Sequence, residues 1–501
     1  MTQPNPTLAD WQTRAAALDI RGRAFVDGRD LDAVSGETFA CINPANGTTL
    51  TTVAACDAAD ADAAVAAARR VFEAGHWSRM APRARKAIMI RFGDLIEEHL
   101  EELALLETLD MGKPIGDSTT IDVPGAARCM RHYGEAIDKI YDEIAPTPDN
   151  ALGMITREPI GVVAAIVPWN FPMLMAAWKI GPALAAGNSV ILKPSEKAPL
   201  SAIRIAALAV EAGMPEGVLN VLPGYGHTVG KALALHMDVD CIAFTGSTAV
   251  GKQIMQYAGQ SNLKRSWLEC GGKTPNVVFA DAPDLDAAAE AAAFAIFFNQ
   301  GEMCTAGSRL LVEESIKDEF VEKVIAAGER MPAGDPLDPA TRVGAIVDDL
   351  QLDRVMGYIE AGKQGGATVR LGGERVFTES GGYFVAPTIF DNVSNDMKIA
   401  QEEIFGPVLS TISFRDEEEA LRIANDTPYG LAAAVWTANM SRGHRMAQRL
   451  RAGTLWVNCF DEGDLTVPFG GFKQSGNGRD KSLHALDKYT ELKTTWIDLS
   501  R

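Results

Sequence analysis

Residues 161–196, GVVAAIVPWNFPMLMAAWKIGPALAAGNSVILKPSE, decide the fold class of this 501-residue chain. An apolar run at 161–167 is followed by a turn, an apolar helical pattern over 172–186 and a second apolar run at 189–192. Short buried strands that alternate with helices are typical of a parallel, doubly wound α/β sheet. Pro168, Pro172, Lys179 and Pro182 interrupt residues 161–192, so we interpret this part as strand, turn, helix and strand and not as a membrane span.

The same alternation continues on both sides of this stretch. Apolar runs at 218–221 and 241–244 extend the first α/β unit, and a second unit begins near Pro275. Ahead of both units, helical patterns occupy residues 57–73, 82–108 and 118–141. In the second unit the predicted strands are 277–279, 308–312, 408–414, 431–436 and 454–457, and the predicted helices are 284–298, 315–329, 346–364, 416–425 and 440–450.

The two ends of the chain differ from this pattern. Residues 1–20 form a polar lead-in and lack the basic and apolar segments of a signal peptide. The run 491–499 alternates between polar and apolar residues, as an edge strand does. An edge strand needs a partner, which another subunit could supply.

The composition excludes several classes of function. The chain has 66 acidic and 47 basic residues, a net charge of −19 and no block of basic residues, so we expect neither nucleic acid nor a membrane surface as partner. Its seven cysteines are scattered without a Cys-x-x-Cys pair, which favours a reducing, cytoplasmic location over disulfides or zinc. The seven histidines lack metal-ligand spacing, so no metal is expected.

Polar turns follow the predicted strands of the first unit, where a doubly wound sheet binds its ligands. Ser247 opens a helix whose N-terminus could hold a phosphate, although an ordinary tight turn has the same pattern. Lys193 and Glu196 follow another strand. The Glu196 carboxylate could bind ribose hydroxyls and would then favour NAD over NADP, or the two side chains could form a solvated charge pair.

Three residues could carry nucleophilic chemistry. Cys304 lies in the loop Asn299–Gly307 between an apolar helix and an apolar strand, and its thiol needs a lowered pKa or a nearby base to react. Glu269 is a candidate general base, and Asn170 is a candidate donor to an oxyanion. The alternatives are a buried apolar cysteine, a structural ion-pair partner and an amide that braces its turn.

Seven motifs, taken together and in order, resemble the NAD(P)-dependent aldehyde dehydrogenase superfamily over about residues 25–497. One position departs from that family, because Cys270 stands where leucine is usual. The motifs are PWNFP at 168–172, LKPSE at 192–196, FTGS at 244–247, LECGGK at 268–273, QGEMC at 300–304, EEIFGP at 402–407 and PFGGFK at 468–473.

This resemblance implies an α/β fold with a Rossmann-like NAD-binding domain, a second α/β catalytic domain and a β oligomerisation arm. It also implies a homo-oligomer, either a dimer or a tetramer built as a dimer of dimers. The implied boundaries are 1–142 and 160–271 for the NAD-binding domain, 272–480 for the catalytic domain, and 143–159 and 481–501 for the arm.

A mechanism is implied as well. Cys304 attacks the aldehyde carbon, and the Asn170 amide holds the oxyanion together with the backbone N–H of Cys304. A hydride passes to the nicotinamide, and Glu269 activates the water that releases the acid from the thioester. Lys193 is counted with these catalytic candidates. The residues implied to hold NAD, with NADP less favoured, are Ile166, Val167, Trp169, Lys193, Ser195, Glu196, Gly226, Gly246, Ser247, Val250, Glu403 and Phe405.

The segments 122–128, 299–304, 461–464 and 467–484 are similar to the γ-glutamyl-γ-aminobutyraldehyde and ω-aminoaldehyde dehydrogenase branch, which serves polyamine and putrescine breakdown. Aromatic residues suit the carbon chain of an aldehyde, and carboxylates could attract an amine or guanidinium, unless they are solvated rim residues. The substrate residues expected from this resemblance are Phe171, Leu174, Trp178, Met303, Thr305, Asp122, Asp461 and Glu462, with Asp464 as a further carboxylate.

Several other functions stay open at this stage. The enzyme could be a broad-specificity dehydrogenase of aliphatic or hydroxy-aldehydes. A CoA-acylating enzyme usually lacks the glutamate base, so Glu269 argues against it. A non-catalytic binding or structural protein on the same scaffold would not need Cys304, Glu269 and Asn170 together. A thiol esterase is conceivable only as a side activity of Cys304.

Overall fold

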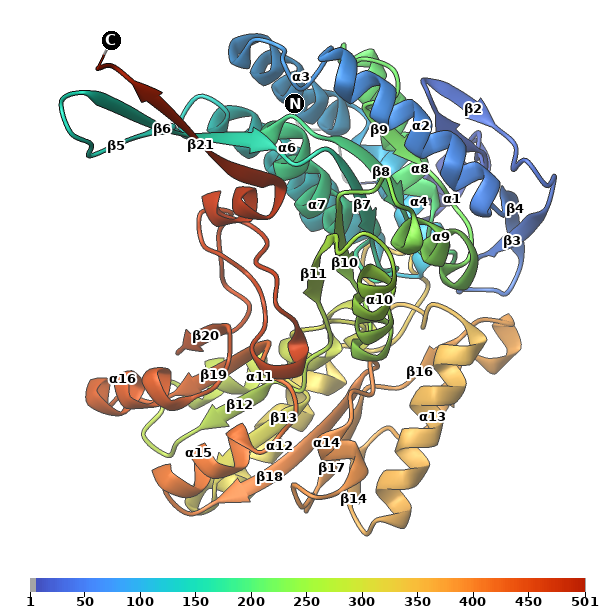
Figure 1. Ribbon diagram of the computed structural model, residues 1–501. Helices are drawn as coiled ribbons and strands as arrows, with labels where there is room; N and C mark the ends of the chain where they lie inside the picture. Colours follow the sequence, from blue (N-terminus) through green and yellow to red (C-terminus); the bar gives the residue numbers. More distant parts are fainter. Residues whose placement is uncertain (1–5, 501) are drawn as a thin grey trace, which may run out of the picture.

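Two seven-stranded sheets carry most of the chain, and a small third sheet projects from them (Figure 1). The computed structural model describes residues 6–500. The first sheet lies in the upper half of Figure 1 and the second in the lower half. Between them runs the C-terminal part of the chain, which returns from the second sheet to the first.

The first sheet confirms the predicted parallel, doubly wound pattern. Its first five strands are parallel, and each of the last two is antiparallel to the strand before it. The strand order is β11 (Arg265–Glu269), β10 (Cys241–Thr245), β7 (Val162–Ile166), β8 (Ser189–Lys193), β9 (Leu219–Val221), β1 (Ala24–Val26) and β2 (Arg29–Leu31). Its helices are α2 (Ala58–Ala74), α7 (Pro172–Ala186), α8 (Leu200–Glu211), α9 (Lys231–Leu235) and α10 (Thr248–Gln260).

The strands and helices of this unit form because apolar residues fill the space between them. Every residue of β7 and of β8 is buried, as a strand covered on both faces requires. The connecting helix α7 begins with Pro172 at its first position and ends at Gly187, whose φ of 101° suits glycine. The chain can therefore turn sharply into β8.

The second sheet has six parallel strands and one antiparallel edge strand, β14. The sequence pattern predicted five of its strands and missed β14 and β17. The strand order is β14 (Thr368–Leu371), β17 (Thr388–Asp391), β18 (Val408–Phe414), β13 (Arg309–Glu313), β12 (Pro275–Val278), β19 (Ala432–Trp436) and β20 (Thr454–Val457). Its helices are α11 (Leu285–Phe297), α12 (Lys317–Glu329), α13 (Asp349–Gln364), α14 (Lys398–Gln401), α15 (Glu417–Asn425) and α16 (Met440–Arg449).

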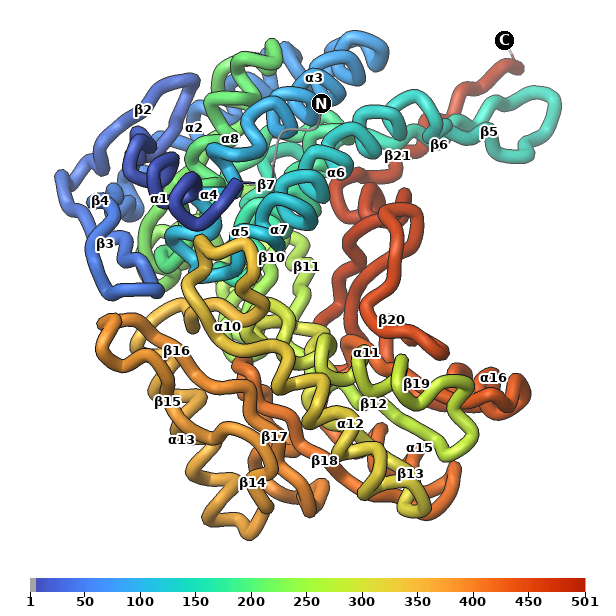
Figure 2. The backbone as a smooth tube through the Cα atoms, turned by 180° about the vertical axis from the view of Figure 1, so that it is seen from behind, coloured from blue at the N-terminus to red at the C-terminus, as the bar shows by residue number. Residues whose placement is uncertain are grey.

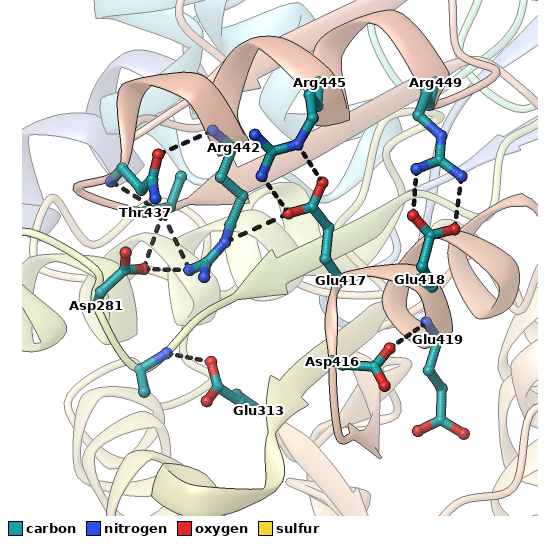
Figure 3. Close-up of polar contacts among 12 residues, drawn as sticks. Asp281, Glu313, Asp416, Glu417, Glu418, Glu419, Thr437, Arg442, Arg445 and Arg449 are labelled. Carbon is teal, nitrogen blue, oxygen red and sulfur yellow. Dashed lines mark hydrogen bonds and ion pairs between the residues drawn. The ribbon is translucent and has the colours of Figure 1, made fainter.

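Arginine and acidic side chains join α15 and α16 at the edge of this sheet (Figure 3). Arg445 binds Glu417 through two contacts of 2.8 and 2.6 Å, and Arg449 binds Glu418 in the same way at 2.5 and 2.7 Å. These residues line neither of the cavities described below. Ion pairs with such exposed arginines add little stability each.

Three N-terminal elements differ from the sequence prediction. Residues 1–5 of the predicted lead-in lie outside the described residues, and α1 (Leu8–Ala16) forms within the rest because Thr7 and Asp10 make a capping box. The helical pattern over 82–108 divides into α3 (Pro82–Glu98) and α4 (Leu100–Met111) at His99. The pattern from 118 begins with a π-helical turn, Ser118–Asp122, before α6 (Val123–Ala136).

The third sheet is an antiparallel arm of β5 (Glu143–Ala145), β6 (Ala151–Pro159) and β21 (Thr490–Asp498). It extends away from both large sheets in the two opposite views (Figures 1 and 2). The predicted C-terminal strand thus finds its partner, β6, within the same chain, and no other strand among residues 6–500 pairs with its second edge. Leu492 and Trp496 on β21 are 62% and 61% exposed.

A returning segment, residues 468–480, connects the two large sheets. The backbone of Ser475 accepts a hydrogen bond of 2.8 Å from Cys270 N–H, and Asn477 N–H donates to Leu268 at 3.0 Å. The segment therefore lies against the end of β11, next to Glu269. Within residues 6–500, no helix combines the length and the apolar character that crossing a membrane requires.

Candidate active site

The loop that carries Cys304 has a strained backbone. Asn299, Gln300 and Gly301 follow α11 with φ values of 50°, 50° and 71°, a left-handed region that non-glycine residues rarely adopt. A side chain at Gly301 would overlap the backbone of Gly406. The three residues reverse the direction of the chain, so that Cys304 faces the region between the two large sheets.

Buried hydrogen bonds hold this strained loop in place. The Asn299 amide donates to the backbone oxygens of Asn170 at 3.0 Å and of Glu302 at 3.1 Å. The Gln300 amide donates to the Glu302 carboxylate at 3.3 Å, which also accepts from the Val347 N–H at 3.1 Å. Sequence reasoning missed these roles because no local pattern indicates which residues meet here.

Cys304 lies where two cavities meet. One, of about 410 Å³, borders the ends of the first sheet's strands, and the other, of about 400 Å³, has seven aromatic side chains in its wall. We call them the polar cavity and the aromatic cavity. Cys304 and Met175 line both. A molecule in either cavity can therefore reach the sulfur atom.

The surroundings of Cys304 favour the neutral thiol. Burial raises the pKa of the thiol, and the nearby carboxylates of Glu403, Asp461 and Glu269 raise that pKa further. Of the two routes to reactivity considered from the sequence, the structure supplies no lowered pKa. The thiol consequently needs a base that accepts its proton during attack.

Asn170 is positioned to donate toward a group bound at Cys304. Its side chain is buried and lines the polar cavity together with Cys304. One amide N–H donates to the Glu302 carbonyl at 2.8 Å, which fixes the orientation of the amide. Because an amide carries two N–H donors, the second can bind a developing oxyanion.

Glu269 ends β11 in a buried position. Neither of its carboxylate oxygens has a hydrogen-bond partner among the described residues. Burial raises its pKa well above the ordinary value, and Asp480 raises it further, while Lys179, Lys488 and Arg479 oppose this shift. The carboxylate lies beside Gly470 and Gly478 and lines neither cavity.

A buried acid with two lysines lies behind Glu269. Asp480, on the returning segment, accepts hydrogen bonds from both Lys179 of α7 and Lys488. Burial opposes ionisation of Asp480, but the two ammonium groups outweigh it and lower the pKa of Asp480. The sequence did not identify this cluster, since Lys179 is 301 residues from Asp480 along the chain.

The polar cavity contains five of the predicted cofactor residues: Trp169, Gly246, Ser247, Glu403 and Phe405. Ser247 caps the 13-residue helix α10, and its Oγ accepts the Val250 N–H at 3.3 Å. Burial raises the pKa of Glu403 to about 7, and its carboxylate accepts the Gly272 N–H at 3.1 Å. The lining residues that sequence reasoning missed are Pro168, Met175, Lys197, Thr245, Thr248, Ala249, Cys270, Gly271, Gln351, Arg354 and Tyr429.

Other predicted cofactor residues lie near this cavity without lining it. Lys193 ends β8 and binds Glu196 at 3.2 Å, and burial lowers the pKa of Lys193. The structure does not bring Lys193 to the wall around Cys304, so contact with the reacting atoms is not available to it. The remaining predicted residues outside the lining are Ile166, Val167, Ser195, Gly226 and Val250.

These features fit a dinucleotide. Small residues open helix α10 at the end of β10, where free N–H groups face the cavity and favour a pyrophosphate. Glu403 offers a carboxylate to ribose hydroxyls, and Trp169 stacks edge-on against Phe405 at 5.2 Å to form an apolar wall for a planar ring. The residues present thus match the phosphate, sugar and ring parts of NAD.

The aromatic cavity contains seven of the predicted substrate residues: Phe171, Leu174, Trp178, Met303, Thr305, Asp461 and Glu462. Five further aromatic rings and a lysine, none of them predicted, complete much of its wall: Phe294, Phe298, Trp456, Phe460, Phe469 and Lys481. Rings on most sides favour a carbon chain or an aryl group as the occupant.

Asp122 is a correction to the predicted substrate residues. Its side chain is fully buried and binds the Lys113 ammonium at 2.9 Å, and its neighbour Ile121 lines the aromatic cavity instead. The π-helical turn Ser118–Asp122 directs Asp122 into the core. Asp464 also does not line the cavity.

Comparison with known proteins places this geometry in context. Residues 31–495 match the aldehyde dehydrogenase family. The chain is 55% identical to the NADP/NAD-dependent aldehyde dehydrogenase PuuC of Escherichia coli, over 98% of this chain and 99% of the relative. The structure resembles P. syringae AldA, an indole-3-acetaldehyde dehydrogenase in complex with NAD+ and IAA, with a TM-score of 0.98 and 66% identity over 99% and 100% of the two chains. It also resembles γ-glutamyl-γ-aminobutyraldehyde dehydrogenase from Burkholderia cenocepacia, with a TM-score of 0.97 and 65% identity over the same shares.

Proposed function

The chain belongs to the aldehyde dehydrogenase family and is an NAD-dependent oxidoreductase, and from this premise we propose that Cys304 is the nucleophile that binds the aldehyde. One observation carries the proposal: Cys304 forms the wall between a cavity suited to a dinucleotide and a cavity suited to a carbon chain. An aldehyde carbon bound to its sulfur would face the cofactor directly, which a hydride transfer requires.

The proposed steps follow from the positions of the side chains. The Cys304 sulfur attacks the carbonyl carbon, and its proton passes to a base. The free N–H of Asn170 and the backbone N–H of Cys304 stabilise the oxyanion. Bound NAD supplies the acceptor for the hydride, after which a thioester remains on Cys304. Glu269 turns from Gly470 and Gly478 toward Cys304 and removes a proton from water, which hydrolyses the thioester to the acid.

The cofactor roles are proposed residue by residue. Ser247 and the N-terminus of α10 would hold the pyrophosphate, and Glu403 with Phe405 would hold the nicotinamide ribose and ring. Lys193 and Glu196 would bind the adenosine ribose, with Ile166 and Val167 as the adjacent strand end. The Glu196 carboxylate would repel a 2′-phosphate and so favour NAD over NADP.

For the substrate we propose ω-amino, ω-guanidino or γ-glutamylamino aldehydes, as formed in polyamine and putrescine breakdown. The name of the Burkholderia relative supports this class, and so do the Asp461 and Glu462 carboxylates within an aromatic wall. The indole-3-acetaldehyde relative supports a second candidate, an aryl or other uncharged aldehyde, because the rings alone could hold it.

A substrate panel tests this proposal. Purified protein with NAD and no CoA would be given 4-aminobutyraldehyde, 4-guanidinobutyraldehyde, 3-aminopropionaldehyde, propionaldehyde and benzaldehyde, and NADH would be followed. We expect kcat/KM for the cationic aldehydes to exceed that for uncharged aldehydes of equal length by about tenfold, because a charge-assisted contact is gained. Equal values would remove the cationic class, and NADH formation only with CoA would contradict the role of Glu269.

We also propose the division into an NAD-binding domain (1–142 and 160–271), a catalytic domain (272–480) and an arm (143–159 and 481–501) through which copies associate. The free edge of β21 and its exposed apolar side chains support association as a dimer or tetramer. A cytoplasmic location is proposed from the seven unpaired cysteines, and cell fractionation tests it.

Charge on the arm should disrupt this association. In the double variant Leu492→Asp and Trp496→Asp, we expect a smaller species in analytical ultracentrifugation, because each added carboxylate would be buried in the contact. Val34→Asp, at a valine that is 69% exposed and remote from the arm in sequence, is the matched control. A double variant that sediments like the unmodified protein would contradict the role of the arm.

A further inference from the structure

Lys481 lines the aromatic cavity, yet neither the proposed catalysis nor the proposed cofactor site uses it. Its ammonium lies 5.4 Å from the centre of the Trp178 ring, and Trp178 packs edge-on against Phe469 at 5.3 Å. Among residues 6–500 this ammonium has no ion-pair partner, although the Asp461 and Asp464 carboxylates are near enough to raise its pKa against the effect of burial. A lysine held in this way has free N–H donors for a ligand.

Asp461 supplies the opposite charge in the same cavity. Thr305, next to Cys304, lines the same cavity wall. Burial raises the pKa of Asp461 to about 7, and Lys481 opposes that shift. The side chain keeps access to solvent through the cavity although protein surrounds it on most sides. The cavity thus presents a carboxyl group and an ammonium group that form no ion pair with each other within residues 6–500.

The backbone holds both charges in strained turns. Asp461, Lys481 and Ser482 have φ values of 56°, 60° and 49°, all in the left-handed region. Such conformations persist only where the surroundings fix them, and they cluster at functional sites. The Ser482 N–H donates to Leu465 at 2.6 Å, and the Tyr133 hydroxyl donates to the Ser482 carbonyl at 3.1 Å. These two hydrogen bonds fix the backbone directly after Lys481.

We propose that Asp461 and Lys481 form a bipolar site for the end of the aldehyde that is remote from its carbonyl, and that this site takes an α-amino acid group. The ammonium of that group would face Asp461 and its carboxylate would face Lys481. The inference rests on the proposed function and narrows it. Within the proposed substrate class it selects γ-glutamylamino aldehydes over bare amino or guanidino aldehydes.

The reason lies in the balance of charge. An end group with only an ammonium is attracted by Asp461 and repelled by Lys481. An end group with only a carboxylate is attracted by Lys481 and repelled by Asp461, and Glu462 adds a second negative charge to the wall. A zwitterionic end group satisfies both sites at once and leaves neither charge unpaired. The aromatic rings between this site and Cys304 would hold the uncharged middle of the molecule.

Four aldehydes on one scaffold test the inference. Each is a 4-acylaminobutanal, and the acyl group is γ-glutamyl, butanoyl, 4-aminobutanoyl or 4-carboxybutanoyl, so the end group is zwitterionic, neutral, cationic or anionic. We expect kcat/KM for the zwitterion to exceed that for the neutral compound about 10- to 100-fold, with the two singly charged compounds in between.

Variants assign this preference to the two residues. Lys481→Met should lower kcat/KM for the zwitterionic compound to the value for the cationic compound, and Lys481→Arg should preserve most of the preference. Asp461→Asn should lower kcat/KM for the zwitterionic compound to the value for the anionic compound. Lys231→Met is the matched control, because its ammonium also lies over an aromatic ring, Tyr257 at 5.8 Å, but outside both cavities.

The outcomes separate the inference from the proposed function. Equal kcat/KM for the four compounds would overturn the bipolar site. So would a decrease in kcat/KM that is the same for all four compounds in both Lys481→Met and Lys481→Arg. In either case the role of Cys304 in NADH formation still stands. Absence of NADH with every compound, including the neutral one, would instead overturn the proposed function and the inference with it.

Discussion

Replacing Cys304 by alanine should reduce NADH formation with every aldehyde by at least about 10⁴-fold, because no other group can form the thioester. The structure makes this loss specific. Six cysteines other than Cys304 are present, but only Cys270 shares a cavity wall with it, and that thiol lines the polar cavity alone. Cys270 does not line the aromatic cavity, so an aldehyde bound there does not reach its sulfur and Cys270 is no substitute nucleophile.

The measurement is steady-state NADH formation with NAD and propionaldehyde. Cys459→Ala is the matched control, since Cys459 is also partly exposed but lines neither cavity, and it should keep its rate within a few-fold. Thermal unfolding of both variants shows whether the fold is retained. A Cys304→Ala variant that keeps a tenth of the activity would disprove nucleophilic catalysis by this residue.

Glu269→Gln should separate the two halves of the reaction. Glutamine keeps the shape of the side chain but cannot accept a proton, so we expect steady-state turnover to fall by about 10²- to 10⁴-fold. Hydride transfer precedes the step that needs water, so a first turnover of NADH should remain visible in stopped-flow measurements. If the first turnover slows as much as the steady state, Glu269 also accepts the proton of Cys304.

The pH dependence of the unmodified enzyme follows from the same residue. Its carboxylate must be ionised to act as a base, and burial, with Asp480 as the second cause, raises its pKa well above 4.5. Turnover should therefore increase as the pH rises through this elevated value and be lost below it. Glu417→Gln, on α15 (Figure 3), is a matched substitution outside the site and should leave both turnover and its pH profile unchanged.

The sequence predicted the elements that apolar runs define. Strands β18 and β20 and helix α7 have the predicted bounds, and in β18 and α7 the buried faces read directly as apolar patterns. It missed β17, whose four buried residues include Thr388 and Asp391, because that composition does not distinguish a short strand from a loop. It also missed the break at His99, where neither Gly nor Pro marks the helix end and a contact with Glu102 and Arg204 decides it.

The candidate site was predictable where it follows the ends of strands. Asn170 and Glu269 are such residues, and Cys304 was marked by its position between an apolar helix and an apolar strand. Asp480 and Lys481 were not assigned roles. They lie on a segment without a periodic pattern, and only long-range contacts bring them to the site. Asp122 was misplaced because a π-helical turn cannot be read from residue spacing.

The returning segment has a consequence for how such a protein can be inherited. The site draws on residues from Asn170 to Lys481, which include the nucleophile, the candidate base and the bipolar site. Residues 468–480 fold back onto β11 and complete this site. Neither large sheet holds a usable site by itself. Gene fusion or exchange of one half could transfer a nucleotide-binding fold to another protein. Aldehyde oxidation could be inherited only with almost the whole chain, which is therefore a single unit of selection.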